Sequence, residues 1–311
     1  MSMNAAPAPA SRRRPRWLAV GLAAVLLLAV VRMMTVEPRT PKPYLEGRLP
    51  TVLAHQGASG HAPSNTLESF RLGMEMGADV IETDVHMTRD GIIVTSHDES
   101  IDRLTNGHGL IKEMTLAELR QFDFGYGFTP DGGKTYPYRG KGVSIPTLEE
   151  VFKTFPGVPV NIELKQEEPV IESKVWDLIR QYQMEDKVLI NSFHSGPMER
   201  WREIAGERAA QGATKSDMYG FVAFYLPYLD RLYQPKVDAL QLPVSQNVGP
   251  FTIHFDTERM IKTAHRMGLR VHYWTINDEE TMRHLVQIGA DGIISDYPDR
   301  VVKVLKEEGL R

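Results

Sequence analysis

Three acidic side chains stand in apolar stretches of the kind that form buried strands. Glu82 and Asp84 lie in the stretch 80–85, and Glu163 lies in the stretch 160–164. Side chains two positions apart in a strand point to the same face, so Glu82 and Asp84 should share one. Carboxylates that meet in one place repel each other unless a positive charge lies among them. Since oxygen ligands suit a hard cation, we predict that Glu82, Asp84 and Glu163 bind Ca²⁺ or Mg²⁺.

The same spacing allows a second interpretation, in which these carboxylates form ordinary ion pairs at a rim. Lys165 shares a strand face with Glu163 and could neutralise it, and Arg89 could act in the same way. If Lys165 faces a substrate instead, its ammonium group would meet a phosphate as a point charge. Spacing alone gives the ion-pair rim and the metal site equal weight.

Two histidines end apolar stretches next to these acids. His55 follows the stretch 51–54, and His97 follows the stretch 92–96. A single histidine at a strand end is more often structural than catalytic. A pair of imidazoles beside three carboxylates can divide the duties of general base and general acid. We therefore predict that His55 and His97 are catalytic.

Trp274 ends a later stretch, 271–275, and should reach the same rim. Its ring could pack against the apolar part of a substrate. For a lone tryptophan, packing in the core is the commoner role.

The elements that position these residues alternate along the chain. Short β-branched stretches alternate with amphipathic helical patterns, which favours a parallel α/β sheet. About eight repeats indicate a distorted (β/α)8 TIM-type barrel, with a doubly wound open sheet as the alternative. The predicted strands are 51–54, 80–85, 92–96, 160–164, 188–191, 220–224, 239–242, 271–275 and 292–295, and the clearest predicted helices are 66–76, 169–182, 257–267 and 279–288. The helix 66–76 should begin at Asn65 as N-cap, with Glu68 completing a capping box.

Two segments depart from this alternation. The strands 80–85 and 92–96 are separated by six residues that end in Asp90-Gly91. A parallel crossover needs a dozen or more residues, and Asp-Gly is typical of hairpins, so this pair should be antiparallel. The segment 99–145 contains one short helical pattern, 115–122, and a stretch rich in Gly, Tyr and Pro. It is predicted to be a small insertion over one rim, as a lid or a plain loop.

The composition narrows the chemistry. The 311 residues include no cysteine, which excludes disulfides, thiol nucleophiles and Cys-ligated zinc. Any metal must be held by Asp, Glu, His or backbone oxygen. The net charge is −4, and after residue 34 acidic residues outnumber basic ones. Such a balance shows no sign of nucleic-acid binding, which usually requires a basic face. The composition says nothing about an oligomeric state.

The N-terminal residues follow the pattern of a signal anchor. A basic segment, 1–16, leads into an apolar run that begins at Trp17, and Met33 and Met34 extend this run. No small-residue cleavage site follows, so we predict a retained transmembrane helix at 17–36. The arginines should stay in the cytoplasm and place the domain outside. A proline-rich linker, 37–50, would then join this cell-membrane anchor to the domain 51–311.

Five segments stand in a fixed order along the predicted domain. They are AHQGASGHAPSNTLESF (54–70), GADVIETDVHMTRDGIIVTSHDESIDRLTNGHG (77–109), IPTLEEVF (145–152), NIELK (161–165) and GADGIISDYP (289–298). Together they resemble the glycerophosphodiester phosphodiesterase family, with which their order and spacing agree from about residue 51 to residue 302.

The resemblance implies a distorted barrel that hydrolyses glycerophosphodiesters to an alcohol and sn-glycerol 3-phosphate. It implies His55 and His97 as the acid–base pair and Lys165 as a phosphate contact. Glu82, Asp84 and Glu163 would be the ligands of Ca²⁺ or Mg²⁺. The segment 99–145 corresponds to the family's small insertion.

Two positions depart from the family pattern. Gln56 stands where the family usually has Arg after its first histidine, and Ser64 stands where it usually has Glu. The Gln56 amide can donate a hydrogen bond to a phosphate but brings no charge. A hydrogen bond to a charged donor contributes about 1.5–3 kcal/mol, against about 1 kcal/mol for a neutral one.

Two alternative functions follow from these observations. Gln56 supports an inactive, membrane-tethered binding module descended from such an enzyme. The anchor and the aromatic residues of the insertion favour a larger substrate, such as a lysophospholipid or a teichoic-acid polymer.

Overall fold

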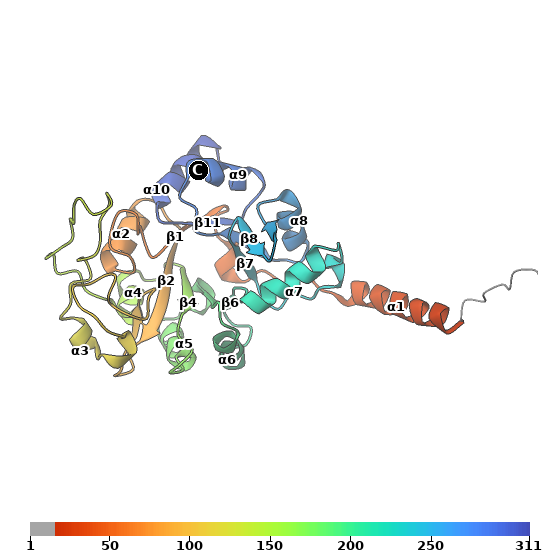
Figure 1. Ribbon diagram of the computed structural model, residues 1–311, viewed down its shortest axis with the longest axis horizontal. Helices are drawn as coiled ribbons and strands as arrows, with labels where there is room; N and C mark the ends of the chain where they lie inside the picture. Colours follow the sequence, from red (N-terminus) through yellow and green to blue (C-terminus); the bar gives the residue numbers. More distant parts are fainter. Residues whose placement is uncertain (1–15) are drawn as a thin grey trace, which may run out of the picture.

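The computed structural model of the protein describes residues 16–311. The predicted basic segment 1–16 therefore lies outside the described residues, apart from Arg16. From Thr51 onward the chain folds around one sheet, with helices on its outer side (Figure 1).

Eight parallel strands form a nearly closed barrel. Their spatial order is β6, β5, β4, β2, β1, β11, β10, β7, and a parallel bridge between Gly212 and Ala239 joins the two ends. This arrangement confirms the predicted (β/α)8 barrel over the open sheet. The strands are β1 (Thr51–Ala54), β2 (Val80–Met87), β4 (Val160–Leu164), β5 (Val188–Asn191), β6 (Ala210–Gln211), β7 (Ala239–Leu242), β10 (Arg270–Tyr273) and β11 (Gly292–Ser295).

The helices bury one apolar stripe each against the outer face of the barrel. In α5, for example, Val175, Trp176 and Ile179 are buried, and they recur at helical spacing. The helices that surround the barrel are α2 (Leu67–Glu75), α4 (Leu148–Thr154), α5 (Glu172–Gln181), α6 (Ser195–Ala205), α7 (Lys215–Tyr225), α8 (Glu258–Arg266), α9 (Glu279–Gln287) and α10 (Pro298–Glu307), with single 3-10 turns at η3 (Glu185–Lys187) and η4 (Asp230–Leu232).

The predicted strand 220–224 is wrong, because these residues belong to α7. Thr214 caps this helix, and Asp217 completes the capping box. The strand at this place in the barrel is the two-residue β6, ahead of the helix. A short apolar run is compatible with a buried strand and with a buried helix. The capping box at Thr214 was the sequence signal that distinguishes the helix from the strand.

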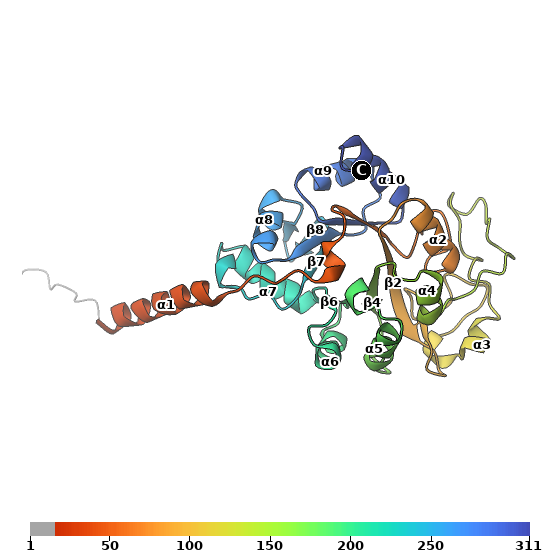
Figure 2. The same cartoon turned by 180° about the vertical axis from the view of Figure 1, so that it is seen from behind.

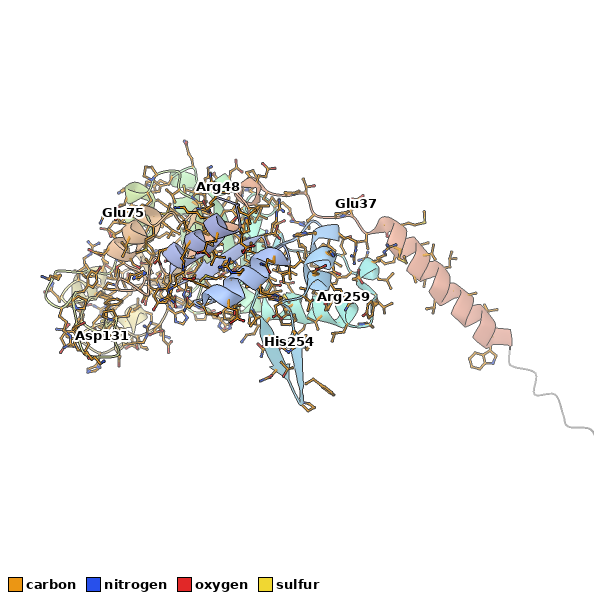
Figure 3. The ribbon with its side chains drawn as sticks, turned by 90° about the horizontal axis from the view of Figure 1, so that it is seen from above. Glu37, Arg48, Glu75, Asp131, His254 and Arg259 are labelled. Atoms are coloured by element: carbon orange, nitrogen blue, oxygen red, sulfur yellow. The ribbon has the colours of Figure 1, made fainter. Side chains whose placement is uncertain are left out.

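The predicted antiparallel pair is confirmed. Strand β3 (Ile93–Thr95) pairs with β2 in antiparallel register, after a turn at Asp90-Gly91. The following segment, 99–145, holds η2 (Ile111–Glu113) and α3 (Leu116–Leu119) around its own small core, which includes Ile101, Leu119 and Phe124. A second hairpin, β8 (Ser245–Val248) and β9 (Phe251–His254), lies outside the barrel sheet and projects from the molecule near His254 (Figure 3).

Helix α1 (Arg16–Thr35) extends away from the barrel (Figure 1). Within residues 16–311, no helix is both long and apolar enough to cross a membrane. The transmembrane anchor predicted at 17–36 is therefore not confirmed.

The segment that follows α1, residues 36–50, lies against the barrel, and we call it the N-terminal strap (Figure 2). Arg39 donates to Asp238 at 2.7 Å, and its backbone N–H donates to the carbonyl of Met267 at 2.8 Å. In the turn η1 (Pro43–Glu46), Tyr44 and Leu45 are buried among inward-facing barrel residues. The strap thus fills part of the barrel interior.

Candidate active site

A pocket opens where the carboxyl ends of the barrel strands meet. In a barrel of this kind the strand ends converge at one face, which explains why residues far apart in sequence come together there. Seven of the eight predicted site residues line this pocket: His55, Glu82, Asp84, His97, Glu163, Lys165 and Trp274. Gln56 does not line it, but its side-chain Nε2 lies 3.4 Å from His55 Nε2.

The acidic residues come from two neighbouring strands. The register of β2 and β4 pairs Asp84 with Glu163 and Glu82 with Asn161, so inward-facing acids stand side by side. Lys165 Nζ lies 2.8 Å from Glu163 Oε2 and 3.1 Å from Asp84 Oδ1. The ion-pair interpretation is therefore correct for Lys165. It is wrong for Arg89, which pairs with Glu118 at 2.8 Å.

The buried carboxyl groups of this cluster disfavour one another's ionisation. Burial and the neighbouring Asp84 charge raise the pKa of Glu82 to about 8, although His55 and the Gln56 N–H, at 2.9 Å, partly offset this. Burial and Asp84 also raise the pKa of Glu163. For Lys165, burial lowers the pKa, but the charges of Asp84 and Glu163 outweigh it and raise the pKa overall. Ionisation of Glu82 and Glu163 beside Asp84 is therefore unfavourable unless further positive charge enters the cluster.

The chemistry of this donor set fits a divalent cation. Glu82, Asp84 and Glu163 offer only oxygen ligands, as a hard cation requires. The buried Oδ1 of Asn191, another pocket residue, has no hydrogen-bond partner. Across residues 16–311, however, no three His, Asp or Glu side chains are already arranged to hold an ion. The Lys165 ammonium group lies within ion-pair distance of both Asp84 and Glu163, so the metal site stays a prediction.

The ring of His55 is hydrogen-bonded to a carboxylate through Nδ1. Its Nδ1 lies 2.6 Å from Asp296 Oδ1, and because an ionised carboxylate can only accept, Nδ1 carries the proton. Asp296 is fixed in turn by Ser59 Oγ and Asn277 Nδ2, each at 2.6 Å. Burial lowers the pKa of His55, but the charges of Glu82 and Asp296 outweigh it and raise the pKa to about 9.

His97, which lines the same pocket, has a similar partner. Its Nδ1 lies 2.8 Å from Asp98 Oδ1, and Arg103 Nε donates to Asp98 Oδ2 at 2.6 Å. Burial raises the pKa of Asp98, but the hydrogen bonds from Arg103 and His97 outweigh it, so the pKa is lowered overall. Both histidines therefore have a carboxylate on Nδ1, which leaves Nε2 for proton transfer.

The predicted cap role of Asn65 is wrong. Thr66 caps α2 and accepts from the Ser69 N–H, whereas Asn65 has a positive φ of 58°. Asn65 Nδ2 instead donates to Asp84 Oδ2 at 3.1 Å. Asn65 Oδ1 accepts from the Thr83 hydroxyl at 2.7 Å. This amide orients a pocket carboxylate.

Three residues of the site were not predicted from the sequence: Asp296, Asp98 and Phe193. Asp296 follows β11 directly and Asp98 follows His97, so a polar residue at a strand end was the available signal. Phe193 had no such signal. Its ring packs edge-to-face on Trp274, with centroids 5.6 Å apart, and Lys165 Nζ lies 5.7 Å from its centroid. The two rings form an apolar wall of the pocket.

Comparison with known proteins shows one consistent relationship. The model of the Glycerophosphoryl diester phosphodiesterase family matches residues 55–300. A glycerophosphodiester phosphodiesterase of Caldanaerobacter subterraneus subsp. tengcongensis is 33% identical over 263 residues, covering 83% of this chain and 98% of that protein. A protein of the same description from Bacillus altitudinis is 30% identical, covering 82% and 98%.

A solved structure of a phosphodiesterase is similar to this chain in both sequence and fold. The Oleispira antarctica phosphodiesterase in complex with the product sn-glycerol-3-phosphate is 29% identical to this chain. It superposes with a TM-score of 0.66, and the match covers 83% of this chain and 97% of that one.

Proposed function

The chain belongs to the glycerophosphoryl diester phosphodiesterase family and is a phosphoric diester hydrolase; we propose that it cleaves glycerophosphodiesters to an alcohol and sn-glycerol 3-phosphate by acid–base catalysis at His55 and His97. One observation carries this proposal. The two histidines, each with a carboxylate on Nδ1, line one pocket that also holds Lys165 and three carboxylates.

The roles follow from the groups in the pocket. One imidazole removes a proton from the nucleophile, and the other protonates the departing alkoxide oxygen. Asp296 and Asp98 keep the two rings in the tautomer that presents Nε2. Lys165 stays protonated beside Asp84 and Glu163, and it supplies a positive contact for a phosphate oxygen. A Ca²⁺ or Mg²⁺ ion held by Glu82, Asp84 and Glu163 would, when bound, stabilise the negative charge that develops on the phosphate.

A direct assay tests the proposal. Release of choline from glycerophosphocholine is measured with the wild-type protein, with and without a chelator. We expect turnover that the chelator abolishes and that Ca²⁺ or Mg²⁺ restores. No turnover under any metal condition, with the substrate still bound, would instead favour the inactive binding module that Gln56 suggested.

We also propose that residues 17–36 hold the chain at the cell membrane, with the barrel outside the cytoplasm. The arginine cluster before Trp17 and the exposed apolar side chains along α1, such as Leu27 and Leu28, support this proposal. Carbonate extraction of membranes is the test. The full chain should stay with the membrane fraction, and a chain beginning at residue 37 should be released.

A further inference from the structure

The chain leaves apolar side chains exposed where α7 ends. Leu226, Tyr228 and Leu229 lie at or just after the C-terminal end of this helix, and all three are exposed. Tyr228 is 74% exposed and has a positive φ of 62°, so a left-handed turn presents its ring to the surroundings. Large apolar side chains that gather on a surface are typical of a site of interaction.

The β8–β9 hairpin adds a further apolar side chain. Phe251 lies at its turn and is 72% exposed, and the hairpin projects from the body of the molecule (Figure 3). The hairpin is joined to the end of α7 through the start of α8, where the Thr257 hydroxyl lies 3.4 Å from the hydroxyl of Tyr225. We call the following set the exposed apolar face: Leu226, Tyr228, Leu229 and Phe251.

Arg259 places a positive charge beside this face. Its guanidinium group lies over the Tyr228 ring, 3.7 Å from the centroid, and over the Tyr225 ring, 3.9 Å from the centroid. It also donates to the backbone carbonyl of Tyr225. Because these partners are uncharged, the contacts orient the guanidinium group without neutralising it.

The carboxylates next to this face in sequence are paired with other basic residues. Asp230 pairs with Arg266 at 2.6 Å, and Glu258 pairs with Lys262. Neither acid is therefore left to oppose the charge of Arg259. An apolar face with a basic residue at its edge suits a partner that is apolar and carries anionic groups.

The exposed apolar face lies next to the end of α1. Residues 226–229 lead directly into η4, and Arg32, near the end of α1, donates from Nε to the carbonyl of Leu232 in η4 at 3.2 Å. Helix α1 itself exposes several apolar side chains. Figure 3 shows Arg259 and the hairpin on the half of the molecule nearer α1, and Asp131 of the insertion at the opposite end.

We propose that the exposed apolar face docks on a phospholipid bilayer with anionic head groups. The rings of Tyr228 and Phe251 enter the interface, and Arg259 meets the lipid phosphates. A second copy of the chain fits less well, because pairing this face with itself brings two Arg259 charges together.

This contact goes beyond the proposed function. It is peripheral, so carbonate would break it while leaving an anchor in place. None of its residues lines the active-site pocket, so hydrolysis of a water-soluble diester does not depend on docking.

Single fluorescent labels locate the contact in the full chain. Because the chain contains no cysteine, one introduced cysteine carries one label. Phe251→Cys reports the hairpin turn, Leu27→Cys reports α1, and Asp131→Cys reports the opposite end. The labelled chains are reconstituted with vesicles of phosphatidylglycerol and phosphatidylcholine that carry brominated acyl chains, since bromine quenches a label that reaches the acyl region. The label at residue 251 should lose about half of its fluorescence, and the label at residue 131 should keep nearly all of it.

Arg259→Gln tests the role of charge. Loss of one basic residue at an anionic surface should lower the ratio of quenched to unquenched label at residue 251 about fivefold. The matched control is Arg300→Gln, because Arg300 likewise stacks on a tyrosine, Tyr297, at 3.8 Å and donates to a backbone carbonyl, but on α10. It should keep the wild-type ratio. Vesicles without phosphatidylglycerol test the same charge dependence without any variant and should lower the ratio as well.

The outcomes separate this inference from the anchor and from the proposed activity. Quenching at residue 27, with residue 251 quenched no more than residue 131, rejects the docking face and leaves the anchor. Quenching at residue 251 without quenching at residue 27 rejects the anchor and keeps the docking face. A label at residue 251 that is shielded from water but not quenched shows that a second copy covers the face, which also overturns the proposal. Turnover of glycerophosphocholine by the same samples tests the proposed function independently.

Discussion

His55 donates from Nδ1 to Asp296 at 2.6 Å, although the two residues are 241 positions apart in the chain. The contact exists because β1 and β11 are neighbours in the barrel, with Ala54 level with Ser295. Each residue directly follows its strand, so the parallel register brings an imidazole and a carboxylate together. Asp296 is therefore expected to position the first catalytic histidine.

Asp296→Asn should lower kcat about 10- to 100-fold with little change in KM, because the amide no longer enforces the tautomer of His55. The pH–rate profile should shift as well, which a merely structural defect would not produce. The matched control is Asp299→Asn, which disturbs a similar pair with His61 at 3.0 Å outside the active-site pocket. Equal losses in the two variants would contradict this role.

His55→Ala and His97→Ala should each reduce the turnover of glycerophosphocholine by about a hundredfold or more, as expected when a general acid or base is lost. His108→Ala is the control, since that side chain is 85% exposed and pairs with Asp102, which does not line the active-site pocket. Near-normal rates in both active-site variants would contradict the roles of His55 and His97 as general acid and base.

Glu163→Gln should weaken binding of Ca²⁺ or Mg²⁺, measured as the shift in unfolding temperature on adding the ion. An ion at 100 times its Kd stabilises a protein by about 2.7 kcal/mol, and this stabilisation should largely disappear in the variant. Glu149→Gln, at a surface residue paired with Lys153, should keep it. If the wild-type protein shows no shift with either ion, the predicted ligand set is wrong.

Tyr44→Ala should destabilise the protein by about 3–5 kcal/mol, because it empties a buried aromatic site inside the barrel. Urea unfolding of the full chain measures the loss. The control is Tyr219→Ala, at a tyrosine on α7 that is 65% exposed, which should cost less than about 0.5 kcal/mol. A small effect of Tyr44→Ala would mean that the strap does not support the barrel.

His272 makes stability depend on pH. Burial lowers its pKa from 6.5 to about 4, with Arg270 adding to this and Asp291 opposing it. Between these values the unfolded state binds the proton and the folded state does not, so stability falls as the pH drops from 6.5 toward 4. The shift corresponds to about 3 kcal/mol. In His272→Gln this component should be absent, and urea unfolding at pH 7 and pH 4.5 measures the difference.

Much of the barrel and its pocket could be predicted from local pattern. Alternation of period two placed Glu82 and Asp84 on one face, and the short Asp-Gly connection required the antiparallel β2–β3 pair. These features depend on residues close in sequence. Local pattern was not sufficient for the apolar run 220–224. Its composition is compatible with a strand, which was predicted, and with the helix that it forms.

The sequence by itself determined which residue types stand at the strand ends, since strand period and turn chemistry are properties of neighbouring residues. Only the tertiary structure decided which of those ends touch. Closure of the barrel brings Asp296 within hydrogen-bond distance of His55 and packs Phe193 against Trp274. It also places Asn65, which was predicted as a helix cap, where its amide donates to Asp84. The physical reason is that strand order and register join segments hundreds of residues apart, and no local preference contains that information.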